Sequence, residues 1–146
     1  MNIILVVCGI IFNKEGKLLA TQRSEQMPLP LKWEFPGGKV IEGEEPSAAI
    51  ERELNEELSV SVRVVRELPT FDHQEETRVI RLLPFVCLLS DSATVVLTEH
   101  AQDRWIGNGE LEHLDWAKAD IPVTQYLKTH WQNLLAALPA DQENAQ

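Results

Sequence analysis

The segment PSAAIERELNEEL, residues 46–58, carries the pattern of an amphipathic helix. Proline is favoured in the first turn of a helix, where its missing N–H would have no intrahelical partner in any case. Ile50, Leu54 and Leu58 then recur every four residues, which places them on one narrow apolar face. The segment therefore predicts a helix that buries this face against the rest of the molecule.

The other side of this helix is crowded with acidic residues. Successive helical residues rotate by about 100°, so one sector of about 140° holds Arg52, Glu53, Glu56 and Glu57. At a separation of about 5 Å and an effective dielectric near 20, each close pair of carboxylates costs roughly 3 kcal/mol. An acidic face of this kind is either fully solvated, helped by an Arg52–Glu56 ion pair, or neutralised by a bound divalent cation.

Apolar runs and turn residues predict the remaining elements. The expected strands are residues 3–12, 17–22, 60–65, 79–89, 95–97 and 104–106. The expected helical segments are a short turn at 109–114 and a longer helix at 121–138. The first two strands form a hairpin, residues 24–32 form a loop with two prolines, and Pro84 implies an edge position or a bulge in its strand. Strands interrupted by two helices predict an α/β (α+β) domain, with a mixed sheet between helices.

Length and charge restrict the classes of partner. The 146 residues suffice for one hydrophobic core, so we expect a single domain at 1–138 and a disordered tail at 139–146. The formal net charge of -10 repels polyanions, which argues against nucleic-acid polymers and anionic membranes as partners. A small anion would need local Arg and Lys side chains or bound cations.

The two cysteines and the N-terminal segment bear on the compartment. Cys8 and Cys87 lie far apart in apolar runs and are expected to be small core residues, which favours a reducing environment. The apolar run at 3–12 is too short to span a bilayer and lacks the basic region and cleavage site of a signal peptide. These features predict a cytoplasmic protein.

The residues around the acidic helix follow a fixed spacing. Counted from Gly38, the order is five residues, Glu44, seven residues, Arg52-Glu53-Leu54, one residue, Glu56-Glu57-Leu58, and then Ser59-Val60. This spacing resembles the Nudix box, the signature of Nudix hydrolases, which has glycine where this chain has Ser59. A glycine there suits a left-handed helix end, so Ser59 either costs on the order of 1 kcal/mol or the helix ends differently.

The resemblance extends over most of the chain and is closest to the MutT-like and CTP pyrophosphohydrolase branch of the family. It is carried by the first hairpin, by Arg23 at its end, by WEFPGGK at 33–39 and by ADIP at 119–122. The branch implies a mixed sheet between helices. It also implies hydrolysis of a nucleoside triphosphate, with release of a nucleoside monophosphate and pyrophosphate.

The resemblance implies a divalent metal site, for Mg²⁺ with Mn²⁺ as a substitute. The implied ligands are Glu53, Glu56, Glu57, the Gly37 carbonyl and Glu99. Glu99 lies six residues before Trp105, as an additional glutamate of the branch does, and would complete the metal site or act as a base; alternatively it is a solvated loop carboxylate. Arg52 and Glu44 would orient the ligands.

The resemblance also implies a substrate-binding set. Its members are Arg23, Glu34, Phe35, Pro36, Gly37, Gly38, Lys39 and Asp120. Arg23 and Lys39 are the cations expected near phosphate oxygens, with the alternative that either is only a surface charge. Asp120 matches a residue that contacts the nucleobase, and it is also placed to be an N-cap. Phe35 and Cys8 would line the base pocket.

Several assignments remain open at this stage. The expected substrates are modified, oxidised or pyrimidine triphosphates such as 8-oxo-dGTP or CTP, which would make the protein a sanitiser of the nucleotide pool. The alternatives are another linked diphosphate, such as ADP-ribose or a dinucleoside polyphosphate, and a non-catalytic nucleotide-binding module. The four tryptophans are expected in the core, the four histidines show no metal-ligand spacing, and the polar segment 71–77 is interpreted as a loop that could cover the pocket. Monomer and homodimer are both compatible with the sequence.

Overall fold

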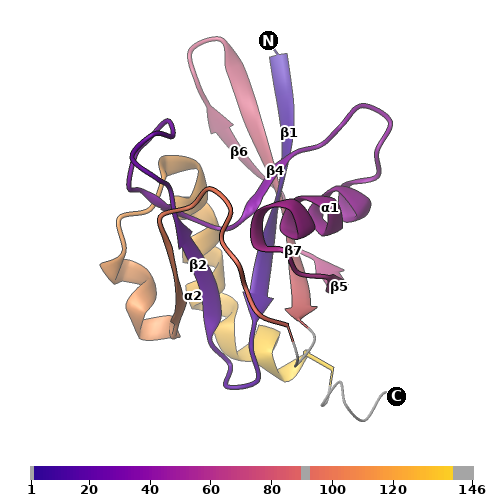
Figure 1. Ribbon diagram of the computed structural model, residues 1–146, viewed down its shortest axis with the longest axis vertical. Helices are drawn as coiled ribbons and strands as arrows, with labels where there is room; N and C mark the ends of the chain where they lie inside the picture. Colours follow the sequence, from indigo (N-terminus) through magenta and orange to yellow (C-terminus); the bar gives the residue numbers. More distant parts are fainter. Residues whose placement is uncertain (1, 90–92, 140–146) are drawn as a thin grey trace.

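The computed structural model describes residues 2–89 and 93–139, which form a mixed sheet with helices on both faces (Figure 1). The strands are β1 (Asn2–Phe12), β2 (Leu18–Gln22), β3 (Trp33–Glu34), β4 (Gly37–Lys39), β5 (Val62–Glu67), β6 (Phe71–Gln74), β7 (Arg78–Leu89) and β8 (Gln102–Ile106). The helices are α1 (Pro46–Leu58) and α2 (Ile121–Ala136), with 3-10 turns η1 (Asn108–His113) and η2 (Lys118–Asp120). The expected α/β (α+β) architecture is confirmed.

The parallel pair β1–β7 is the centre of the sheet. Its register runs without a break from Asn2↔Arg78 to Phe12↔Leu88. The sheet continues in the order β3-β2-β1-β7-β5, with β4 also paired to β1, β6 to β7 and β8 to β2. All these outer pairs are antiparallel, so the sheet is mixed.

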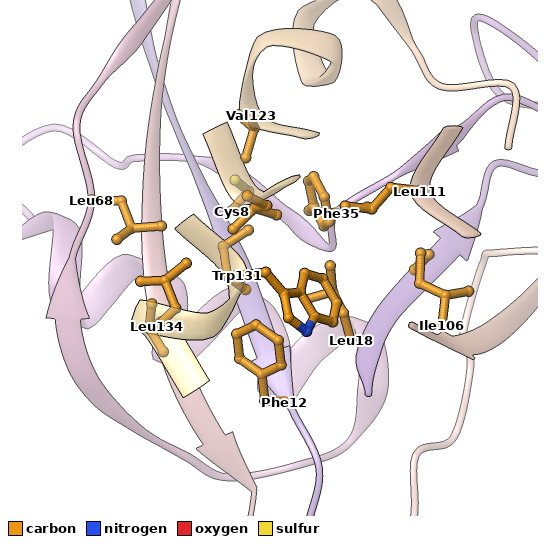
Figure 2. Close-up of a cluster of buried hydrophobic side chains, with 14 of the residues drawn as sticks. Cys8, Phe12, Leu18, Phe35, Leu68, Ile106, Leu111, Val123, Trp131 and Leu134 are labelled. Atoms are coloured by element: carbon orange, nitrogen blue, oxygen red, sulfur yellow. The ribbon is translucent and has the colours of Figure 1, made fainter. Parts of the chain in front are cut away.

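Alternation along β1 supplies both faces of the sheet with core residues. Val7 and Ile11 are fully buried on the α1 side, where they pack with the predicted apolar face of that helix. Cys8 and Phe12 point to the α2 side, and the Phe12 ring meets Trp131 edge-on with centroids 5.3 Å apart (Figure 2). Each large side chain buried in this way stabilises the fold by roughly 2 kcal/mol.

The tryptophans contribute to these cores as expected. Trp33, Trp116 and Trp131 are buried on the α2 side, and Trp105 is half-buried against the α1 side. Both cysteines are buried and free. No helix in the described part of the chain is long and apolar enough to cross a membrane.

The predicted helices agree closely with the structure. The helix predicted at 46–58 is found at these bounds, and the second helix ends at Ala136, two residues early. Ser59 adopts the left-handed conformation expected of the family's glycine, with φ 56 and ψ 37, and its N–H donates to the Asn55 carbonyl. The helix therefore ends in the ordinary way with an unfavourable residue at that position. Residues 140–146 of the expected tail lie outside the described residues.

Two strand predictions and one loop prediction are wrong. Pro84 lies in the central strand β7, not at an edge, at the point where its partner changes from β6 to β5. Its carbonyl accepts the Leu68 N–H at 2.9 Å, so its missing N–H faces the β5–β6 connection, where no ladder bond is lost. Residues 95–97 form no strand because they cross the end of α1, where the Val96 N–H donates to the Leu58 carbonyl at 2.9 Å.

The polar segment 71–77 begins as a strand. Phe71 and His73 are half-buried while Asp72 and Gln74 are exposed, and this alternation lets β6 pair with β7. The segment is therefore part of a hairpin and not the expected covering loop.

Candidate active site

Gly37 and Gly38 bring β4 close to both β1 and α1. A Cβ on Gly37 would collide with the Val7 carbonyl oxygen, and one on Gly38 would collide with the Glu53 carboxylate. Neither glycine has a positive φ. The two glycines are needed for close approach, which lets the acidic side of α1 lie against the sheet edge.

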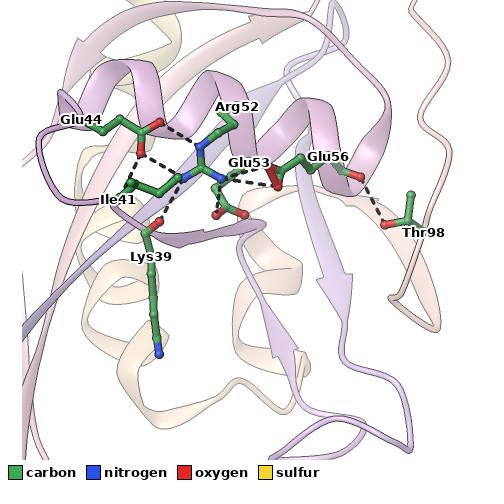
Figure 3. A network of polar contacts seen from close by, with 7 residues as sticks. All are labelled: Lys39, Ile41, Glu44, Arg52, Glu53, Glu56 and Thr98. Carbon is green, nitrogen blue, oxygen red and sulfur yellow. Dashed lines mark hydrogen bonds and ion pairs between the residues drawn. The ribbon is translucent and has the colours of Figure 1, made fainter.

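Arg52 organises the outer part of the acidic face. Its guanidinium donates to both Glu44 oxygens, at 2.8 and 3.0 Å, and to one oxygen each of Glu53 and Glu56, at 3.1 and 3.0 Å (Figure 3). It also donates to the Lys39 carbonyl at 3.2 Å. These hydrogen bonds lower the pKa of Glu44 and raise that of Arg52. We refer to Glu44, Arg52, Glu53 and Glu56 as the Arg52 cluster.

Glu57 lies deeper than the Arg52 cluster. Its pKa is raised to about 8, first by burial and then by the charges of Glu34, Glu53 and Glu99, while the hydrogen bond from the Gly37 N–H opposes the shift. Its Oε2 is buried and has no hydrogen-bond partner among the described residues. A desolvated carboxylate among other acids, with one oxygen unsatisfied, is where a missing cation would be most stabilising.

Glu99 is brought to this point from a different part of the chain. Its side chain is exposed, yet its charge contributes to the raised pKa of Glu57. The preceding residue holds the segment in place, because the Thr98 N–H donates to the Glu57 carbonyl at 3.2 Å. Glu53 and Glu99 therefore both lie close enough to Glu57 for their charges to act on it, and the shared metal site that the family resemblance implies stays a prediction.

The donor chemistry of this site fits a hard divalent cation, although its side chains are not yet gathered around one point. In the described part of the chain no three His, Cys, Asp or Glu side chains form a ready metal-binding group. Glu53 and Glu56 are instead turned to Arg52. The unsatisfied Glu57 oxygen and the surplus of negative charge match an oxygen-seeking ion, which would draw the other carboxylates in by side-chain rotation.

Asp120 lies on the α2 side of the sheet and is buried. Its Oδ1 accepts the Phe35 N–H at 3.2 Å, and burial, followed by the charge of Glu34, raises its pKa to about 8. It stands at the N-cap position of α2 but makes no side-chain capping bond, because the carboxylate is turned toward Phe35. The side-chain N-cap interpretation is therefore wrong, and the interpretation as a base-contacting residue stays a prediction.

The other members of the expected substrate-binding set surround these carboxylates. Phe35 is buried, with its ring 4.7 Å from that of Trp116, and Pro36 is buried, with its carbonyl accepting the Gly9 N–H at 2.8 Å. Burial, followed by the charge of Asp120, raises the pKa of Cys8, which places that thiol near the carboxylate.

The two expected phosphate-binding cations differ. Arg23 is not free: its Nη1 lies 2.6 Å from Glu34 Oε1, and both side chains are less than a fifth exposed. Lys39 is exposed, and its ammonium points away from the Arg52 cluster (Figure 3). Contact of either side chain with phosphate stays a prediction.

His100 is a member of this region that the sequence did not reveal. Its side chain is 2% exposed, and its Nε2 lies 2.7 Å from Glu34 Oε2. The two residues are 66 positions apart in the chain, and a single histidine without ligand spacing carries no sequence signal. Its position directly after Glu99 was the only available indication.

Comparisons with known proteins agree with this geometry. The NUDIX domain family matches residues 3–131. The chain is 33% identical over 141 residues to the CTP pyrophosphohydrolase of Escherichia coli K12, covering 97% of this chain and 100% of that protein. It is 40% identical over 79 residues to the 8-oxo-dGTP diphosphatase of Haemophilus influenzae, covering 54% and 58% of the two chains. The solution structure of the E. coli ORF135 protein matches with a TM-score of 0.76 at 34% identity, covering 97% and 96%.

Proposed function

This chain belongs to the NUDIX family, whose hydrolases use a divalent metal ion, and from this premise we propose that it is a Mg²⁺-dependent nucleoside triphosphate pyrophosphohydrolase. The reaction is NTP plus water to NMP plus pyrophosphate. The observation that carries the proposal is the buried, unsatisfied Glu57 oxygen with Glu34, Glu53 and Glu99 around it. The likeness to a CTP pyrophosphohydrolase over nearly the whole chain, and to an 8-oxo-dGTP diphosphatase over half, supports pyrimidine or oxidised triphosphates as substrates.

Each carboxylate has a distinct part in the proposed reaction. Glu53, Glu56 and Glu57, with the Gly37 carbonyl, would hold the metal. When bound, a divalent cation neutralises phosphate charge and lowers the pKa of a coordinated water. Arg52 keeps Glu53 and Glu56 oriented between substrate encounters, since its donors reach both.

The attacking water needs a proton acceptor and an aligned phosphoanhydride. Glu99 is solvent-exposed and near Glu57, so in the proposal it takes the proton as the water oxygen bonds to phosphorus and the bridging oxygen leaves with pyrophosphate. Arg23 and Lys39 would bind phosphate oxygens. For Arg23 this means sharing its guanidinium between Glu34 and the substrate.

Asp120 is proposed to select the nucleobase. The carboxyl is buried beside Phe35 and Cys8, on the opposite side of the 34–37 segment from Glu57. A carboxyl group there can hydrogen-bond amino and imino groups of a base edge. Asp120→Asn should change the order in which nucleotides are preferred; an equal loss for all of them would leave Asp120 with only a structural role.

The decisive assay offers the protein Mg²⁺ and a panel of canonical triphosphates, oxidised triphosphates, ADP-ribose and dinucleoside polyphosphates. Pyrophosphate release from CTP or 8-oxo-dGTP supports the proposal. Preferred cleavage of the linked diphosphates would transfer the same chemistry to another substrate class, and no turnover of any compound would leave a nucleotide-binding module.

A matched pair of variants on α1 tests the site itself. Glu56→Gln should abolish turnover while the circular dichroism spectrum stays unchanged. Glu51→Gln makes the same chemical change at an exposed position of the same helix and should keep full activity. Undiminished turnover of Glu56→Gln would refute the proposed metal site.

A further inference from the structure

The residues on both sides of Glu99 are fastened to the elements that carry the other carboxylates. On one side, the Thr98 N–H and its Oγ1 hydroxyl both donate to the Glu57 carbonyl at 3.2 Å. On the other side, His100 Nε2 lies 2.7 Å from Glu34 Oε2. The first contact joins the segment to the last turn of α1, where Figure 3 shows the Thr98 hydroxyl beside the helix, and the second joins it to β3.

Glu34 is itself held rigidly. Its two carboxylate oxygens have different partners, because Oε1 lies 2.6 Å from Arg23 Nη1 and Oε2 faces His100. Its backbone carbonyl also accepts the Thr21 hydroxyl at 3.1 Å, where β3 pairs with β2. The carboxylate cannot rotate without losing one of two charge-assisted contacts, so it is a fixed anchor for the imidazole.

The imidazole of His100 makes one side-chain hydrogen bond and has no other polar partner among the described residues. The carboxylate of Glu34 can only accept, so Nε2 donates to it, and Nδ1 is buried without a hydrogen-bond partner among the described residues. A buried polar atom without a partner reduces stability, and an apolar side chain at this position would avoid that loss. The contact with Glu34 is therefore what this histidine supplies that a leucine would not.

The backbone after His100 is held in place independently of the imidazole. The Ala101 N–H donates to the Gln22 carbonyl at 2.8 Å, and β8 begins at Gln102, opposite Gln22. Residues beyond His100 are thus fixed to β2 whether or not the imidazole is present. What the imidazole adds is a constraint on the residues before it, which include Glu99.

We propose that His100 is a positioning residue, which through its hydrogen bond to Glu34 holds Glu99 beside Glu57. The role of Glu99 rests on the proposed function, whereas the placement of the segment does not. Loss of the bond would let the exposed Glu99 side chain leave the site while β8 and α1 stay in place.

A set of variants at position 100 separates this role from simple packing. His100→Gln keeps a nitrogen donor at the reach of Nε2, and His100→Asn keeps one only at the reach of Nδ1, too short for Glu34. Activity is measured on the triphosphate that the panel identifies. We expect His100→Asn to lower kcat about 10- to 100-fold with KM within about threefold of wild type, and His100→Gln to restore kcat to within about threefold. Equal losses in both variants, or no loss in His100→Asn, would overturn the proposal.

Paramagnetic broadening by Mn²⁺ gives a readout that needs no turnover. In the wild type and in His100→Gln, Mn²⁺ should broaden the side-chain carboxyl carbon resonances of Glu57 and Glu99 to a similar extent, whereas in His100→Asn the Glu99 carboxyl carbon should broaden far less than that of Glu57. Equal broadening at Glu99 in all three proteins would overturn the positioning role whatever the activity. This pattern of broadening without hydrolysis of any nucleotide would sustain the positioning role and refute the proposed function.

Two further proteins guard against a folding artefact. His100→Leu removes both ring nitrogens and suits the buried position, so it should remain folded and match His100→Asn in kcat and in broadening. His113→Asn makes the same change at an exposed histidine of η1 and should match the wild type. A folded His100→Leu protein with wild-type kcat would count against the proposal even if His100→Asn did not fold.

Discussion

The Arg52 cluster and the inner carboxylates Glu57 and Asp120 differ in what determines the pKa of their carboxyl groups. In the cluster, one guanidinium contacts three carboxylates, and the pKa of Glu44 falls because of its hydrogen bonds to Arg52. At the two inner positions burial is the leading cause of change, and both pKa values rise to about 8. A carboxylate is thus stabilised as an anion at Glu44 and destabilised at the two inner positions, while at Glu53 burial raises the pKa although Arg52 opposes the shift.

This difference shows where a ligand is needed. Exposed ion pairs contribute little to stability, so the cluster serves mainly to keep its side chains oriented. Carboxyl groups kept without a counter-charge in a desolvated place reduce stability, and such groups are concentrated at functional sites. We therefore expect the reactive and recognition positions at the inner carboxylates, and substitutions can alter one region while leaving the other intact.

The largest effect is expected from Glu57→Gln. The change removes the buried anion from the site, so kcat should fall about a thousandfold, equivalent to about 4 kcal/mol of transition-state stabilisation. The fold should not weaken, because the unpaired buried charge is gone. Steady-state kinetics and urea unfolding check the two statements. A kcat within tenfold of wild type would remove Glu57 from the centre of the site.

Next in size is a pH-dependent gain in stability for Asp120→Asn. The folded-state pKa of Asp120, about 8, lies above its ordinary value of 3.8, so the folded protein binds this proton more tightly than the unfolded chain does. Stability from this carboxyl is complete below about pH 4 and is lost as the pH rises through 8. Asparagine has no proton to lose, so the variant should match wild type near pH 4 and exceed it by several kcal/mol at pH 9.

Urea unfolding of both proteins between pH 4 and pH 9 measures this difference. Asp115→Asn, at an exposed aspartate paired with Lys32, is the control for the chemical change alone. A difference that stays constant with pH would show that Asp120 does not titrate in this window.

Arg52→Lys disturbs the Arg52 cluster and leaves the inner carboxylates unchanged. Lysine keeps the positive charge but cannot reach three carboxylates and the Lys39 carbonyl at once with a planar fork of donors. We expect kcat and Mn²⁺ affinity to fall about 10- to 100-fold, with little loss of stability. Calorimetric titration with Mn²⁺ measures the affinity, and an unchanged binding constant would mean that the carboxylates orient themselves.

The smallest effect is expected from Ser59→Gly, which changes the scaffold of α1 and none of its acids. Because Ser59 has φ 56, glycine should raise the free energy of unfolding by about 0.5–1 kcal/mol and leave kcat unchanged. Ser47→Gly, within the same helix, should instead lower it by a similar amount. If Ser59→Gly altered kcat, the end of α1 would influence catalysis as well as stability.

The local sequence pattern was sufficient to predict the elements that are determined by residues within them. The helix at 46–58 was predicted to the residue because Pro46 and the four-residue apolar period both lie within it. The short strands β3, β4 and β6 were not predicted, since a strand of two to four residues exists only through a partner that the chain supplies elsewhere. The apolar run at 95–97 misled for the same reason, because no strand in the described part of the chain pairs with it.

The site residues also fall into those whose placement follows from local sequence and those whose placement depends on distant parts of the chain. Helix geometry placed Glu53, Glu56 and Glu57 on one face, but the choice of Glu57 as the buried member depends on Gly37, on Glu34 and on Glu99, which come from other elements. Burial of Asp120 and its bond to Phe35 likewise depend on how α2 meets β3. Chemistry set by neighbours distant in sequence cannot be read from spacing alone.

The parallel pairing of β1 with β7 has a consequence for the order of folding. Everything from residue 13 to residue 77, including β4 and α1, lies in the loop that this pairing closes. Closing so long a loop costs entropy before any contact repays it, so folding should take milliseconds to seconds, as in other proteins rich in distant contacts. A chain still emerging from the ribosome, with β7 not yet made, would have the acidic helix and strands β1 to β4 but neither the central pair of the sheet nor Glu99, and so no complete site to act on the nucleotides around it.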